Sequence, residues 1–107
     1  MNIVLILVTC PDNAVAHNLS NQLLQRREAA CVNIIPGISS VYWWEGEVES
    51  DSEVLLLIKT TTELISKAEQ TVTNYHPYDT PEFVVLSTQH VNEQYAAWVI
   101  NNVATQP

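Results

Sequence analysis

Two adjacent tryptophans, Trp43 and Trp44, constrain the fold of this chain more than any other feature. They end an apolar stretch, and Gly46 follows them at a point where its conformational freedom favours a tight turn. Successive side chains of a β-strand point to opposite faces, so the two indoles cannot share one side of a sheet. Each indole has a large apolar surface that needs cover. A small two-layer domain has helices for one face only, so we expect a second copy of the chain to cover the other.

Length and charge narrow the range of functions. The 107 residues are enough for one domain over 1–107, and an apolar content of 47% supports a packed core. Twelve acidic residues against four basic ones give a net charge of -8. Neither a nucleic acid nor an anionic membrane is expected as a partner, because both require a basic surface. The apolar run at 3–8 is too short to span a bilayer and lacks a preceding basic residue, so we expect a cytoplasmic protein.

Hydrophobic periodicity predicts seven elements in the order β-α-β-β-α-β-α. The expected strands are 2–9, 31–35 continued at 38–44, 48–58 and 82–88, and the expected helices are 12–28, about 60–76 and from 92 onward. Pro36, followed by Gly37, predicts either an edge position or a bulge. Thr60 with Glu63 has the spacing of a capping box. Two β-α-β units with right-handed crossovers form an α+β, ferredoxin-like β-α-β-β-α-β sandwich with a C-terminal helix. All helices would lie on one face, and the bare second face again predicts an oligomer.

Acidic residues occupy every second position through the turn and the strand that follows it. These are Glu45, Glu47, Glu49, Asp51 and Glu53. In a regular strand at least the last four of them share one face at a spacing of about 7 Å, twice the rise per residue. Such a row could collect divalent cations weakly. The alternative, which we favour because a single row of like charges lacks the convergence of a tight metal site, is a solvated arm whose charges prevent aggregation at a sheet edge.

The segment from His76 to Glu82 combines two prolines with several groups able to bind cations. The prolines restrict the backbone, and that rigidity could direct His76, Asp79 and Glu82 toward a cation or a small polar ligand. The alternative is a stiff turn in which His76 caps the second helix, where the helix dipole favours it.

The remaining reactive side chains do not define a catalytic site. Cys10 and Cys31 are expected at opposite ends of the sheet, which argues against a disulfide or a shared metal. We expect Cys31 to be a small buried hydrophobic residue. Cys10 is the better candidate for a reactive thiol, because it precedes a helix whose dipole favours the thiolate. Lys59 could bind an anion or pair with a carboxylate. The sequence has neither a Gly-rich phosphate loop nor the context of a catalytic triad, so we do not expect an enzyme.

Together these segments resemble the CutA family of divalent-cation tolerance proteins. The matching pieces are Thr9-Cys10-Pro11-Asp12, Ala29-Ala30-Cys31-Val32-Asn33, Ser40-Val41-Tyr42-Trp43-Trp44-Glu45-Gly46, Ile58-Lys59-Thr60 and His76-Pro77-Tyr78-Asp79-Thr80-Pro81-Glu82. The resemblance implies a ferredoxin-like subunit in a tight homotrimer, a link to copper tolerance, and copper binding. Two departures are Asp79-Thr80, where the family usually has Glu-Val, and Glu28, where it commonly has Leu.

The leading hypothesis is therefore a non-enzymatic homotrimer that binds divalent cations, Cu²⁺ first. Its candidate metal ligands are His76, Asp79, Glu82 and Cys10, and a trimer could bring the 76–82 loop close to Cys10 or Lys59 of a neighbouring subunit. Its candidate cleft and interface residues are Tyr42, Trp43, Trp44, Lys59 and Tyr78. The alternative is a signalling or scaffold trimer, resembling the PII regulators, that binds a small molecule or protein partner between subunits. The scarcity of Lys and Arg argues against a nucleotide as that ligand.

Overall fold

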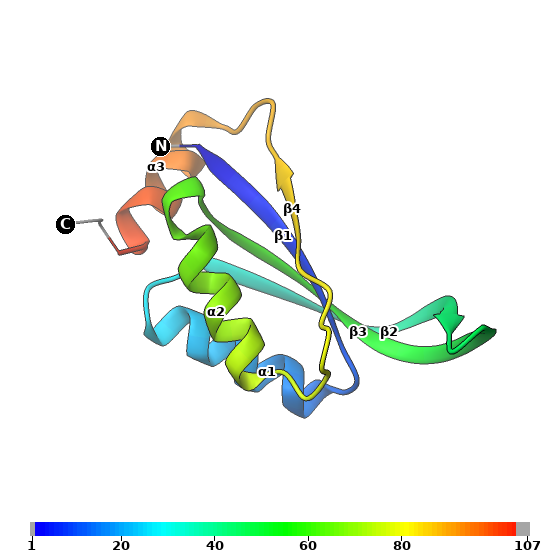
Figure 1. Ribbon diagram of the computed structural model, residues 1–107. Coiled ribbons are helices and arrows are strands. Elements are labelled where there is room, and N and C mark those ends of the chain that lie inside the picture. The colour runs from blue at the N-terminus through cyan, green and yellow to red at the C-terminus, as the bar shows by residue number, and fades with distance from the viewer. Residues whose placement is uncertain (1, 105–107) are drawn as a thin grey trace.

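The computed structural model describes residues 2–104 and shows a sheet with helices packed against it (Figure 1). The order of elements is the predicted one. The strands are β1 (Ile3–Cys10), β2 (Cys31–Trp44), β3 (Glu47–Thr61) and β4 (Val84–Ser87), and the helices are α1 (Asn13–Gln25), α2 (Ile65–Tyr75) and α3 (Glu93–Asn102). The strands lie in the order β2-β3-β1-β4, and all neighbouring strands are antiparallel. This is the topology of the ferredoxin-like α+β sandwich.

The core lies between α1, α2 and one face of the sheet. Val4, Ile6, Val8 and Cys10 are buried alternate residues of β1, and they pack in one cluster with buried residues of both helices. Alternation places Leu5, Leu7 and Thr9 on the other face of β1, where they are only partly buried. The sheet therefore has one covered face and one open face.

The third helix departs from the prediction that all helices lie on one face. The α3 helix contacts β1 and β3, and the Lys59 ammonium lies 5.8 Å from the centre of the Tyr95 ring. Lys59 pairs across the sheet with Leu5, so it belongs to the open face. Thus α3 reaches the face that α1 and α2 leave open, but it covers only the end near the start of β1.

The β2–β3 hairpin continues beyond the rest of the domain as a two-stranded arm (Figure 1). Glu45 and Gly46 form its turn with positive φ angles of 49° and 81°, the requirement of a two-residue type I′ turn. The predicted bulge is present as a register shift between Ile35 and Ile38. The arm helps to give the chain its elongated dimensions of 44 × 27 × 21 Å.

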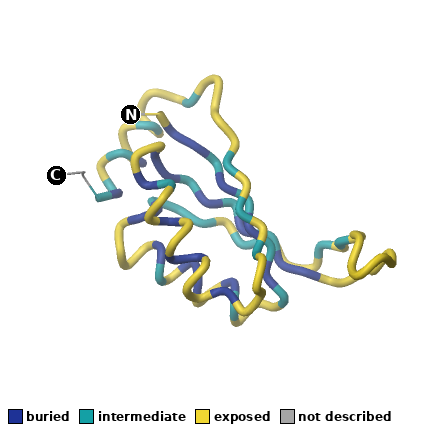
Figure 2. Tube along the Cα trace, in the orientation of Figure 1, coloured by how far each residue is buried: buried dark blue, intermediate teal, exposed yellow. Residues whose placement is uncertain are grey.

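The two tryptophans lie on opposite faces of this arm, as predicted. Trp43 pairs with Val48 and Trp44 pairs with Glu47, and cross-strand partners share a face. Trp43 is 74% exposed and Trp44 is 60% exposed, and Figure 2 shows that exposure extends over the tip of the arm. The arm therefore carries a large apolar surface that this chain does not cover itself.

Several element boundaries differ from the predicted ones. Pro11 precedes the first helix instead of lying in its first turn, because the Asp12 side chain caps it by accepting a 2.9 Å hydrogen bond from the Val15 amide. The capping box at Thr60 is wrong: β3 continues through Thr61, and the Thr60 hydroxyl donates to the carbonyl oxygen of Glu28 at 2.7 Å. The last strand is shorter than predicted.

Candidate functional site

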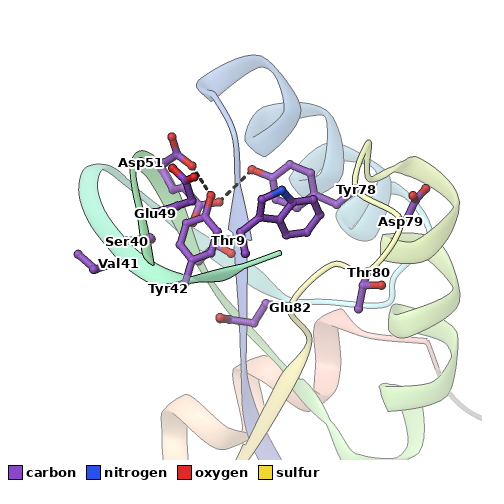
Figure 3. A pocket seen from close by; sticks show the side chains of 12 residues that line it. Thr9, Ser40, Val41, Tyr42, Glu49, Asp51, Tyr78, Asp79, Thr80 and Glu82 are labelled. Atoms are coloured by element: carbon purple, nitrogen blue, oxygen red, sulfur yellow. Dashed lines mark hydrogen bonds between the residues drawn. The ribbon is translucent and has the colours of Figure 1, made fainter. Parts of the chain in front are cut away.

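A cavity of about 880 Å³ lies where the arm meets the segment that joins α2 to β4 (Figure 3). Its lining includes five carboxylates, from Glu49, Asp51, Glu53, Asp79 and Glu82. Its aromatic lining comes from Tyr42, Trp44 and Tyr78. None of the described residues that line this cavity is a Lys, Arg or His. The cavity is therefore acidic, with aromatic walls and no built-in counter-charge.

The hairpin register explains how the arm contributes to this cavity. Tyr42 lies opposite Glu49, and Ser40 lies opposite Asp51, so these residues share one face of the arm. Glu53 continues the same alternating row toward the body of the domain. The predicted single-faced row is thus confirmed within β3, whereas Glu45 lies in the turn.

Two tyrosines donate hydrogen bonds to acids of the row, as the dashed lines in Figure 3 mark. The Tyr42 hydroxyl donates to Asp51 within the hairpin. The Tyr78 hydroxyl donates to Glu53 Oε2 at 3.0 Å and so connects the 76–82 segment to the base of the arm. The hydrogen bond to Asp51 raises the pKa of Tyr42 to about 12. Burial, followed by the hydrogen bond to Glu53, raises the pKa of Tyr78 to about 12.

Glu53 is the most enclosed acid of the cavity, with only 8% of its surface exposed. The Tyr78 hydroxyl is its hydrogen-bond donor, and no cationic side chain among residues 2–104 pairs with it. Burial of a charge without a counter-charge is costly. The negative potential of Glu53 extends to its neighbours: burial, and then the charge of Glu53, raises the pKa of Glu82, although Glu82 is exposed overall.

The predicted ligand His76 is held by the backbone. It is buried, its Nε2 atom lies 2.8 Å from the carbonyl oxygen of Thr9, and its Nδ1 atom accepts a 3.1 Å hydrogen bond from the Tyr78 amide. This assigns the ring proton to Nε2, which donates to Thr9. Both nitrogens are engaged, so coordination of a metal would require the loss of one hydrogen bond. His76 is also the C-cap residue of α2, as the alternative interpretation of this segment expected.

The prediction that Cys10 has a stabilised thiolate is wrong. Cys10 points into the core between the sheet and the helices and is fully buried. Burial, followed by the charges of Glu53 and Asp12, raises the pKa of its thiol to about 12. Cys10 pairs with Val54 and Cys31 pairs with Lys59, so the two free cysteines lie toward opposite ends of β3, as expected.

The four predicted metal ligands do not converge within one chain. Asp79 and Glu82 line the cavity, whereas His76 and Cys10 do not. In the described part of the chain, no three His, Cys, Asp or Glu side chains are grouped so that they could hold one metal ion. Figure 3 shows Asp79 and Glu82 at separate positions along their segment.

The predicted cleft residues divide in the same way. Tyr42, Trp44 and Tyr78 line the cavity, whereas Trp43 and Lys59 lie elsewhere. The Lys59 ammonium lies 5.8 Å from the centre of the Tyr95 ring, in the arrangement of a cation–π contact.

Sequence reasoning missed the two tyrosine–carboxylate pairs and the burial of Glu53. A signal for the first pair was available: a two-residue turn at 45–46 fixes the register that places Tyr42 beside the acid row. No local signal places Tyr78 against Glu53, because that contact joins residues 25 positions apart through the packing of the loop.

Comparison with known proteins relates the chain to one family. The family model described as CutA1 divalent ion tolerance protein matches residues 4–102. The chain belongs to the CutA1 family. A curated relative, the divalent-cation tolerance protein CutA of Thermus thermophilus, is 44% identical over 97 residues, which are 91% of this chain and 94% of the relative.

Structural similarity to CutA1 proteins extends over the whole fold. The crystal structure of CutA1 from Oryza sativa matches with a TM-score of 0.96 and 38% identity, covering 99% of this chain and 97% of that one. A chloroplastic CutA of Arabidopsis thaliana is 42% identical over 92% of this chain, which spans only 54% of that longer relative. The resemblance inferred from the tryptophan hairpin and the His-Pro-Tyr loop is confirmed.

Proposed function

We propose that this CutA1 protein is a non-enzymatic homotrimer that supports tolerance of divalent cations by binding them, Cu²⁺ first. The observation that carries the proposal is the acidic cavity, where five carboxylates meet no cationic side chain of the described chain. Family membership supports the link to divalent-cation tolerance. Copper is the first cation to test because the family resemblance implies it.

Three assembled subunits would cover the apolar surface that one subunit exposes. Val41, Trp43 and Val48 are all more than half exposed on one face of the arm. The short edge strand β4 and the helix α3 add exposed Leu86 and Trp98. Apolar surface distributed over an arm, an edge strand and a helix suits closed assembly of identical subunits.

Asp79, Glu82 and Glu53 are the proposed ligands within the cavity. Carboxylates bind divalent cations. Burial, and then the charge of Glu53, raises the pKa of Glu82, and a bound cation would offset the second of these two effects. His76 and Cys10 remain candidates only through a rearrangement, because one is held by the backbone and the other is buried. We propose a cytoplasmic location, with which the two free cysteines are consistent. No helix among residues 2–104 is long and apolar enough to cross a membrane.

Calorimetric titration of chelator-treated protein with Cu²⁺ tests the proposal. We expect binding that Glu82→Gln weakens, while Glu69→Gln, an equal change of charge at an exposed position of α2, leaves it unchanged. If the wild type gives no heat of binding beyond the heat of dilution, or if the two variants bind Cu²⁺ with equal affinity, the cavity is not the cation-binding site.

The second candidate, a PII-like trimer that binds a small molecule, is favoured by the cavity volume and the aromatic walls. A volume of about 880 Å³ is typical of small-molecule sites. A nucleotide does not suit five carboxylates. A thermal-shift screen separates the candidates: stabilisation by nucleotides or organic anions, and not by Cu²⁺, would favour this one.

A further inference from the structure

We draw no further inference here: the strongest candidate, the acidic cavity between the hairpin arm and the 76–82 segment, belongs to the site already described and is lined in part by the surface that we propose other copies of the chain cover.

Discussion

Replacement of His76 by phenylalanine separates a structural role of this side chain from metal ligation. The phenyl ring occupies similar space but removes both ring hydrogen bonds, to the Thr9 carbonyl oxygen at 2.8 Å and from the Tyr78 amide at 3.1 Å. His76 is only 7% exposed, so water does not readily replace these partners. A buried polar group left without a partner costs about 1–3 kcal/mol, so two of them predict a loss of roughly 2–6 kcal/mol.

Thermal unfolding of metal-free protein at one fixed concentration measures this loss. A change of 1 kcal/mol shifts the Tm of a domain of this size by about 4–8 °C, so we expect a decrease of at least about 8 °C. His17→Phe is the matched control, because His17 is exposed on α1 and its replacement should change the Tm by less than about 2 °C. A His76→Phe protein with the Tm of the wild type, but without a stabilising effect of Cu²⁺, would refute our interpretation and restore His76 as a ligand.

Three further predictions follow from burial and charge. In folded protein near pH 8, iodoacetamide should modify Cys31 well before Cys10, because the Cys10 thiol is fully buried and has a pKa of about 12. Mass spectrometry that shows Cys10 modified first would contradict this. Because the pKa of Glu82 is raised in the folded protein, its protonated form stabilises the fold below the unfolded-state pKa, and this stability is lost as the pH rises through the folded-state pKa. Glu82→Gln should therefore raise the Tm at pH 7 and have little effect near pH 3; a larger increase in Tm at pH 3 than at pH 7 would contradict the direction of the pKa shift. Absorbance titration at 295 nm should show Tyr42 and Tyr78 ionising near pH 12, and replacing either one by Phe should remove its share of that late phase.

The elements that depend on local signals could be predicted from the sequence. Periodicity located α1 and α2, and the turn at Glu45 and Gly46 set the register that places Trp43 and Trp44 on opposite faces. Local signals failed where tertiary contacts compete with them. Thr60 has the spacing of a helix cap, but its hydroxyl is used by the Glu28 carbonyl oxygen 32 positions away.

The site was predictable only as a list of segments. The acid row and the 76–82 loop were both recognised, yet their union depends on the packing of Tyr78 against Glu53. The alternation of β1 could have predicted that the Cys10 side chain lies in the core with Val8 and Ile6. That burial outweighs the effect of the helix dipole on the thiol. Glu28, the departure from the family pattern, is buried as well, and its Oε1 atom accepts a 2.5 Å hydrogen bond from the Thr71 hydroxyl.

Light scattering coupled to size-exclusion chromatography tests most directly the claim that other copies of the chain cover the hairpin arm. At micromolar concentration in neutral buffer we predict a mass of about 36 kDa, three times the 12.0 kDa of one chain. Replacement of Trp43 by glutamate should shift that mass toward a single subunit. A wild-type mass of 12.0 kDa at every concentration would show that the exposed indoles do not drive assembly.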